Sequence, residues 1–147
     1  MDMLAQVCSG AVYGVDAYPV EIEVNLSHGD PQTVIVGLPN AAVKESKDRV
    51  LTAIRNSGFK THTGRITINL APADIKKEGP DFDLPIAIGL LAANDDIDPV
   101  RAGKYGIIGE LALSGEVRRV KGVLPIAMRL REEGVDGAAR DRHVVGT

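Results

Sequence analysis

The sequence predicts an α/β fold, specifically an α+β two-layer sandwich in which about three helices cover a mixed sheet. Polar and apolar residues alternate over 20–26 and over 65–70, which is typical of strands with one solvent-exposed face. Between and after these strands, apolar residues follow helical spacing. Aromatic residues are scarce, with three Tyr, two Phe and no Trp, so aliphatic side chains must form the core. The 147 residues suit one domain.

The first third of the chain reads as three strands. Two β-rich runs between Met3 and Leu26 flank a turn at 13–16, and a short apolar run follows at 33–36. Turn-forming residues separate the second and third runs. Because consecutive strands joined by turns usually pair, we expect an antiparallel meander.

The next segment predicts a helix that begins with Asn40 as N-cap and runs to about Ser57. Gly58 then provides the residue that commonly follows a helix C-cap. Glu45 and Arg49 stand four residues apart, and we expect them to pair on the solvent side.

A second helix is predicted after the charged loop that follows residue 70. Asp83 is a candidate N-cap, and Pro85 falls in the first turn, where its missing N–H is harmless. Residues 86–93 are apolar on every side, so we expect this helix to be packed on all sides.

The C-terminal part predicts a strand at 105–113 that turns into a second strand at 116–120, then a helix at about 124–133. We expect one domain at 1–135. Residues 136–147 show no period and are expected to form an irregular tail, as in a truncated or excised piece of a longer protein.

Composition excludes several classes of site. The net charge of −3 provides no overall basic surface, so nucleic-acid binding would need a local patch. Cys8 is the single cysteine, which excludes an internal disulfide and a cysteine-rich zinc site. No signal peptide or apolar run long enough to cross a membrane is present, so we expect a soluble, cytoplasmic chain without membrane partners.

Motifs for nucleotide and metal binding are incomplete. The string 102–105 contains Gly-Lys but lacks the following hydroxyl residue and the upstream glycine of a phosphate loop. The loop carboxylates could together hold Mg²⁺, but roles at a helix start and pairing with nearby lysines explain them better. We therefore expect no metal site; these carboxylates are Asp74, Glu78, Asp81 and Asp83.

Basic residues form two local groups. Lys76 and Lys77 lie in the central loop, and Arg118, Arg119 and Lys121 follow the last predicted strand. A solvated surface and a phosphate-contacting patch explain them equally well. No aromatic residue interleaves with them, so base stacking has no support.

Five strings of the chain carry a resemblance to a known family: Val36–Val50, Asn56–Phe59, Asn69–Gly79, Phe82–Ala87 and Gly109–Gly115. In this order they resemble the N-terminal domain of the Mg-chelatase-like AAA+ family known as YifB or ComM, and the resemblance covers residues 3–134. It implies a fold like the proteolytic domain of Lon protease and the second domain of a small-subunit ribosomal protein. It also implies assembly as a hexameric ring, with ATP and Mg²⁺ bound by a separate ATPase module. One branch of the family includes a helicase for DNA branch migration in natural transformation.

The comparison with Lon tests for protease chemistry. Lon places a nucleophilic serine in a turn before an apolar helix, and a lysine acts as its base. The matching turn here reads Gly79-Pro80-Asp81, so Asp81 occupies the serine position, and Leu124 falls near the lysine position. We expect no catalytic residues and no enzyme activity in this chain.

We therefore expect a non-catalytic accessory domain that contributes ring assembly and weak DNA contact, with no cofactor of its own. The nucleic-acid-binding candidates are the two basic groups described above. A purely structural oligomerisation or protein-docking module is the alternative. A remnant serine-lysine peptidase is another, and it would need an unexpected nucleophile such as Ser114.

Overall fold

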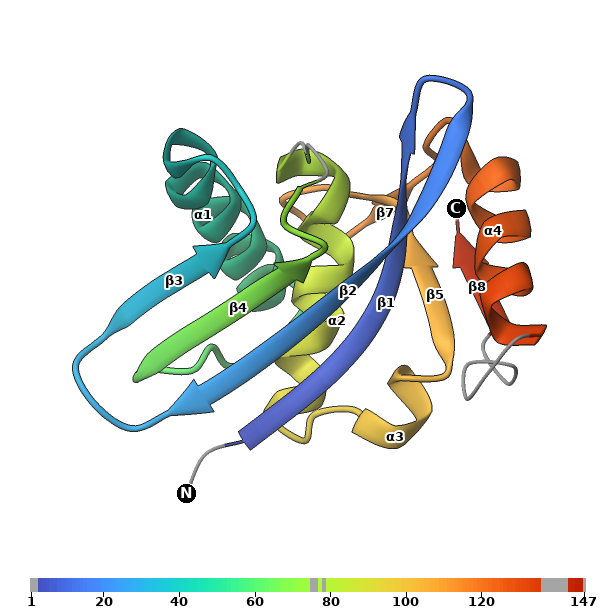
Figure 1. Ribbon diagram of the computed structural model, residues 1–147. Coiled ribbons are helices and arrows are strands. Elements are labelled where there is room, and N and C mark those ends of the chain that lie inside the picture. Colours follow the sequence, from blue (N-terminus) through green and yellow to red (C-terminus); the bar gives the residue numbers. More distant parts are fainter. Residues whose placement is uncertain (1–2, 75–76, 78, 136–142, 147) are drawn as a thin grey trace.

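A six-stranded mixed sheet forms the centre of the protein in the computed structural model (Figure 1). The structure describes residues 3–74, 77, 79–135 and 143–146. The described elements are β1 (Met3–Tyr13), β2 (Asp16–Ser27), β3 (Gln32–Val36), α1 (Asn40–Asn56), β4 (Arg65–Ala71), the 3₁₀ turn η1 (Gly79–Phe82), α2 (Asp83–Ala93), α3 (Pro99–Ala102), β5 (Tyr105–Ile108), β6 (Glu110–Leu111), β7 (Val117–Arg118), α4 (Val123–Val135) and β8 (His143–Gly146).

The strand order is β3-β4-β2-β1-β5-β8. β2 is antiparallel to both β1 and β4, whereas β3–β4, β1–β5 and β5–β8 are parallel pairs. The expected meander is therefore wrong at its third strand. α1 carries the chain back before β4 begins, so β4 runs parallel to β3 and lies between β3 and β2.

The predicted strand alternation is confirmed in the centre of the sheet. Ile22 is opposite Leu70, and Val24 is opposite Ile68, with all four side chains at most 1% exposed. Glu21 and Glu23 alternate with them on the other face. The buried face of these strands therefore forms the main core with helices α1 and α2.

Helices α2 and α4 lie on opposite faces of the sheet. At Gly89 of α2, an added Cβ would be 2.8 Å from a methyl carbon of Val24 and close to Val7. At Gly10, a Cβ would overlap Ile126 of α4. Val7 and Gly10 are three residues apart in β1 and so point to opposite faces. Thus α2 packs on one face and α4 on the other, and Figure 1 shows α4 beside β5 and β8.

Helix ends show one correct and one wrong prediction in α1. Gly58 follows the C-cap with a φ of 89°, and its N–H donates to Arg55 O at 3.0 Å. Asn40, however, is the first helical residue; Pro39 is the N-cap and no side chain caps the helix. The Leu38-Pro39 sequence already directs the chain into the helix, since Pro39 fixes φ at −59°.

Residues 143–146 form β8, although an irregular tail was expected there. β8 pairs in parallel with β5, Tyr105 opposite His143 and Ile108 opposite Gly146. Four residues are too few to show a period, so only pairing defines this strand. Residues 136–142 and 147 lie outside the described part of the chain. Among the helices that the structure describes, none combines the length and apolar character needed to cross a bilayer.

Candidate functional site

The turn before α2 carries Asp81, the residue that the resemblance to Lon leads us to expect at its serine position. η1 leads directly into α2, and Asp81 is exposed on η1, whereas Asp83 is 1% exposed at the start of the helix. Phe82, 1% exposed, anchors the turn in the core. The turn therefore presents the Asp81 carboxylate to solvent and keeps the Asp83 carboxylate inside.

Asp83 joins α2 to α1. Its Oδ1 accepts hydrogen bonds from Ser46 Oγ at 2.7 Å and from Arg49 Nη2 at 3.3 Å, and its Oδ2 accepts one from Arg49 Nε at 2.5 Å. Ser46 and Arg49 stand one turn apart on α1, so both reach the same carboxylate. We call this group the α1–α2 latch.

The latch corrects one prediction and adds a partner to another. Asp83 is not an N-cap, because Phe82 occupies that position and no side chain caps α2. Arg49 does approach Glu45 at 3.8 Å as expected, but its shorter contacts are with Asp83. The sequence signal for the latch was a carboxylate at the start of an apolar helix, which cannot distinguish a cap from a buried ion pair.

Burial raises the pKa of Asp83 because desolvation disfavours its charged form, while hydrogen bonds from Arg49 and Ser46 act in the opposite direction. The hydrogen bond to Asp83 raises the pKa of Arg49, which stays charged. The Asp83 carboxylate makes these contacts with side chains of α1, so it serves the packing of the two helices.

Leu124, near the matching Lon lysine position, does not form a second catalytic position with Asp81. It is 71% exposed on α4, which packs mainly against β1 and β2 on the face opposite to α2. The described geometry therefore gives no nucleophile-and-base pair at these two positions.

Of the two central-loop lysines, Lys77 is not exposed as was expected. Lys76 lies outside the described residues, as does the loop residue Glu78. Lys77 is 3% exposed, and its Nζ donates a hydrogen bond to the Pro72 carbonyl oxygen. Burial lowers the pKa of Lys77, and Asp74 partly offsets this. The hydrogen bond to Pro72 therefore ties the buried Lys77 to the end of β4 and draws its charge away from solvent.

The second basic group is exposed as expected. Arg118 ends β7, and Arg119 and Lys121 lie in the loop that leads to α4; all three are exposed. Glu110 on β6 is opposite Arg118 and offsets part of its charge. β6 contacts η1, so this basic hairpin lies beside the turn that carries Asp81.

Neither metal nor nucleotide binding is supported by the donors in place. Among the described residues, no group of three or more His, Cys, Asp or Glu side chains is arranged to hold a metal ion. Gly103 and Lys104 connect α3 to β5, whereas a phosphate loop connects a strand to a helix. This segment therefore does not fit ATP.

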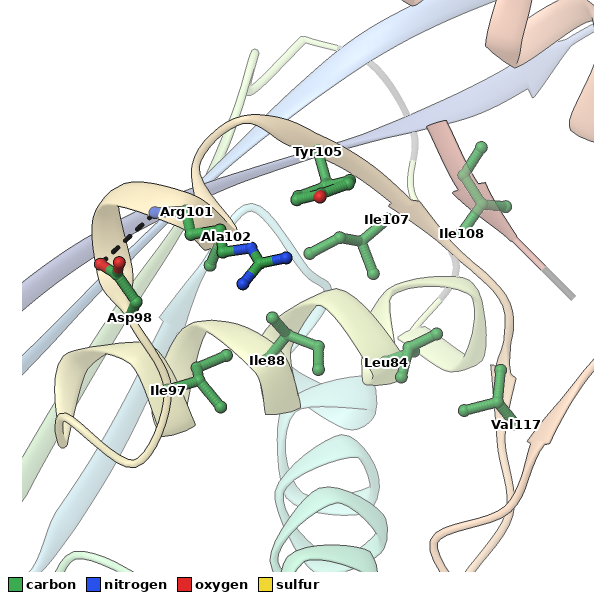
Figure 2. A pocket seen from close by; sticks show the side chains of 10 residues that line it. All are labelled: Leu84, Ile88, Ile97, Asp98, Arg101, Ala102, Tyr105, Ile107, Ile108 and Val117. Atoms are coloured by element: carbon green, nitrogen blue, oxygen red, sulfur yellow. Dashed lines mark hydrogen bonds between the residues drawn. The ribbon is translucent and has the colours of Figure 1, made fainter. Parts of the chain in front are cut away.

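An apolar groove lies along the other side of α2, and sequence reasoning missed it (Figure 2). Its volume is about 460 Å³. The prediction that α2 is packed on all sides is wrong here, since Ile88 is only half-buried and faces the groove. The lining residues are Leu84, Ile88, Ile97, Asp98, Arg101, Ala102, Tyr105, Ile107, Ile108 and Val117.

Comparison with known proteins agrees with this fold. A family model described as subunit ChlI of Mg-chelatase matches residues 22–139. Competence protein ComM of Haemophilus influenzae is 53% identical over 122 residues, which are 83% of this chain and 24% of that protein. The uncharacterized protein YifB of Escherichia coli is 47% identical over 131 residues, 89% of this chain and 26% of that protein.

A more distant relative is Lon protease 2 of Bacillus subtilis, 32% identical over 91 residues, which are 62% of this chain and 16% of that protein. This match and the mixed sheet with helices confirm the predicted α/β, Lon-like fold class. The chain spans about a quarter of the length of the ComM and YifB relatives.

Proposed function

Because this chain belongs to the Mg-chelatase ChlI family together with ComM and YifB, we propose that it is a non-catalytic accessory domain of a longer AAA+ ATPase. In this role it contributes contacts between subunits of a ring and a local contact to DNA. ATP and Mg²⁺ are bound by a separate module of the family protein.

The observation that carries this proposal is the pair of carboxylates where η1 leads into α2. Asp81 stands where the Lon-like turn requires a serine, and Asp83 is committed to Ser46 and Arg49. A carboxylate does not replace the hydroxyl nucleophile of a serine-lysine peptidase. In this proposal the Lon-like fold therefore provides binding surfaces and no catalytic residues.

The exposed basic hairpin supports a DNA contact. Arg119 and Lys121 are exposed beside Arg118, and among the described residues no ion pair within hydrogen-bonding range joins either of them to a carboxylate. Phosphate contacts of this kind need no overall positive charge and depend strongly on salt. Glu21 and Glu23 lie on the outer face of the sheet, where their negative charges repel DNA phosphates. DNA is therefore expected to bind at the basic residues and not on that face.

The test is a titration of labelled duplex and branched DNA with the whole chain at several salt concentrations, read by fluorescence anisotropy. We expect weak binding that falls steeply with salt. The Arg119→Ala/Lys121→Ala double variant should reduce the slope of log affinity against log salt by about 2, one for each lost phosphate contact.

The matched control is Lys44→Ala/Lys47→Ala, which removes the same charge from exposed positions on α1. It should leave the slope unchanged. A flat titration at low salt, or an equal effect of both double variants, would reject the DNA contact and leave a purely structural docking module. Lys76→Ala tests the part of the prediction that lies outside the described residues.

A peptidase remnant is the other alternative. Ser114 is exposed, but its Oγ accepts a hydrogen bond from Glu116 N at 3.3 Å within the turn between β6 and β7. That contact favours a structural role for the hydroxyl group. Cleavage of an unfolded substrate protein that disappears in Ser114→Ala would restore the enzymatic hypothesis.

A further inference from the structure

The groove is lined by apolar side chains and is open to solvent, and charged residues lie at one end of it. α2 supplies Leu84 and Ile88, β5 supplies Ile107, and α3 closes the end (Figure 2). An exposed concavity of this composition is typical of a surface that binds another apolar surface.

Arg101 determines the charge of this end. Figure 2 shows its guanidinium extending over the groove near Ile88. The neighbouring Asp98 carboxylate accepts hydrogen bonds from Val100 N at 3.0 Å and Arg101 N at 3.5 Å, so it is directed to the start of α3. The groove therefore favours an occupant with apolar side chains and a carboxylate beside them.

The outer face of α4 has these properties. Leu124 is 71% exposed and Met128 is 57% exposed, four residues apart, and Glu132 follows after four more. Spacing of four places all three on one helical stripe. The opposite side of α4 is already used, because Ile126 and Leu130 are buried with Cys8 and Ile108. We call the three exposed residues the α4 stripe.

The pairing is also compatible in charge. Glu132 contacts Arg129 at 3.5 Å, but that pair is exposed and so contributes little in water. Glu132 is thus available to a second cation. Arg101 is exposed at the end of the groove and provides one.

One molecule cannot join its own stripe to its own groove, because α4 and α2 lie on opposite faces of the sheet. A contact between two different surfaces of the same chain is heterologous, and it generates a ring or an open filament. This geometry suits repeated head-to-tail assembly.

We propose that the α4 stripe of one copy binds in the apolar groove of a second copy, with Glu132 of the first facing Arg101 of the second. Leu124 and Met128 then cover Ile88 and Ile107. This proposal rests on the assembly part of the proposed function and is independent of the DNA contact.

The first experiment is sedimentation velocity of the whole chain over a concentration series. Wild type should self-associate reversibly beyond a dimer. Arg101→Glu and Glu132→Arg should each weaken association at least tenfold, because each places like charges together. The double variant Arg101→Glu/Glu132→Arg should recover most of it, since every interface again has opposite charges. These positions are exposed, so folding is preserved, and circular dichroism checks this.

A mixing experiment tests the head-to-tail arrangement. Leu124→Glu/Met128→Glu has an intact groove but no apolar stripe, and should be monomeric. Mixed with Arg101→Glu, which keeps an intact stripe, it should form dimers and nothing larger. Val15→Glu is the control for an added surface glutamate, since it places one negative charge at an apolar residue that is 96% exposed on the β1–β2 turn. It should associate like wild type.

A monomeric wild type, failure of the charge swap, or equal weakening by Val15→Glu would each overturn the proposal. If the wild type forms a dimer that the stripe and groove variants weaken, but the two variants do not associate when mixed, then the contact is symmetric. That result would also overturn the proposal. DNA titration of the monomeric stripe variant separates the two parts of the function. Retained DNA binding there leaves the DNA contact standing even when the assembly proposal fails.

Discussion

The two sides of helix α2 differ sharply although every residue of the helix after Asp83 is apolar. On the side of α1, Asp83 and the Ser46–Arg49 pair form a closed polar latch within a packed core. On the side of β5, Ile88 lines a groove open to solvent. The difference shows that uniform hydrophobicity of a helix does not determine which of its sides the chain itself covers.

The largest effect should come from breaking the latch. Arg49→Met keeps the aliphatic stem but leaves the Asp83 carboxylate buried without its cation, and we expect a loss of about 3 kcal/mol in the free energy of unfolding at neutral pH. Urea denaturation measures it. Arg55→Met, an exposed arginine in the last turn of α1, is the control and should change stability by less than about 0.5 kcal/mol. A loss below about 1 kcal/mol at Arg49 would show that the latch contributes little.

A matched pair of core substitutions should sharpen the comparison between the two sides. Ile86 is 1% exposed and Ile88 is half-buried, two residues apart in α2. Ile86→Ala should cost about 2 to 5 kcal/mol, because it leaves a cavity in a packed core. Ile88→Ala should cost about 1 kcal/mol, since its side chain loses less buried surface. Equal losses in urea denaturation would mean that the groove closes in solution.

The smallest effect should be the pH dependence of the latch. Because burial raises the pKa of Asp83 in the folded state, its protonated form is favoured by folding. The contribution of Asp83 to the free energy of unfolding should therefore be fully present below the ordinary carboxyl pKa. It should be lost as pH rises through the raised pKa of the folded state.

This effect is measured as the difference in unfolding free energy between wild type and Asp83→Asn across acidic pH. The difference should decrease with rising pH and then become constant, since other titrations cancel between the two proteins. A difference that increases with pH would instead mean that pairing with Arg49 outweighs desolvation.

Local patterns predicted the parts of the fold that depend on nearby residues. The alternation at Val20–Leu26 needs only one buried face, and Gly58 needs only the end of a helix. The exposed basic residues Arg118, Arg119 and Lys121 were also found, because short strands and loops leave charged side chains in water.

Other features depend on partners distant in sequence. Asp83 meets Arg49 across 34 residues, which converts an apparent cap into a buried ion pair. β3 and β4 can pair in parallel because helix α1 lies between them in the chain and returns it to the same end of the sheet. β8 is defined only by its pairing with β5. Lys77 is a different case: its partner Pro72 is only five residues away, but the burial of this lysine depends on how the loop packs and was not visible in the local pattern.

The sequence by itself determined the fold class and the family, because both are written in residue types and their order. Only the tertiary structure decided that Asp83 closes one side of α2 while the other side stays open. Burial depends on the folded chain as a whole, because a side chain is desolvated by the residues that pack against it. Those residues can be distant in sequence, so the local pattern does not reveal them.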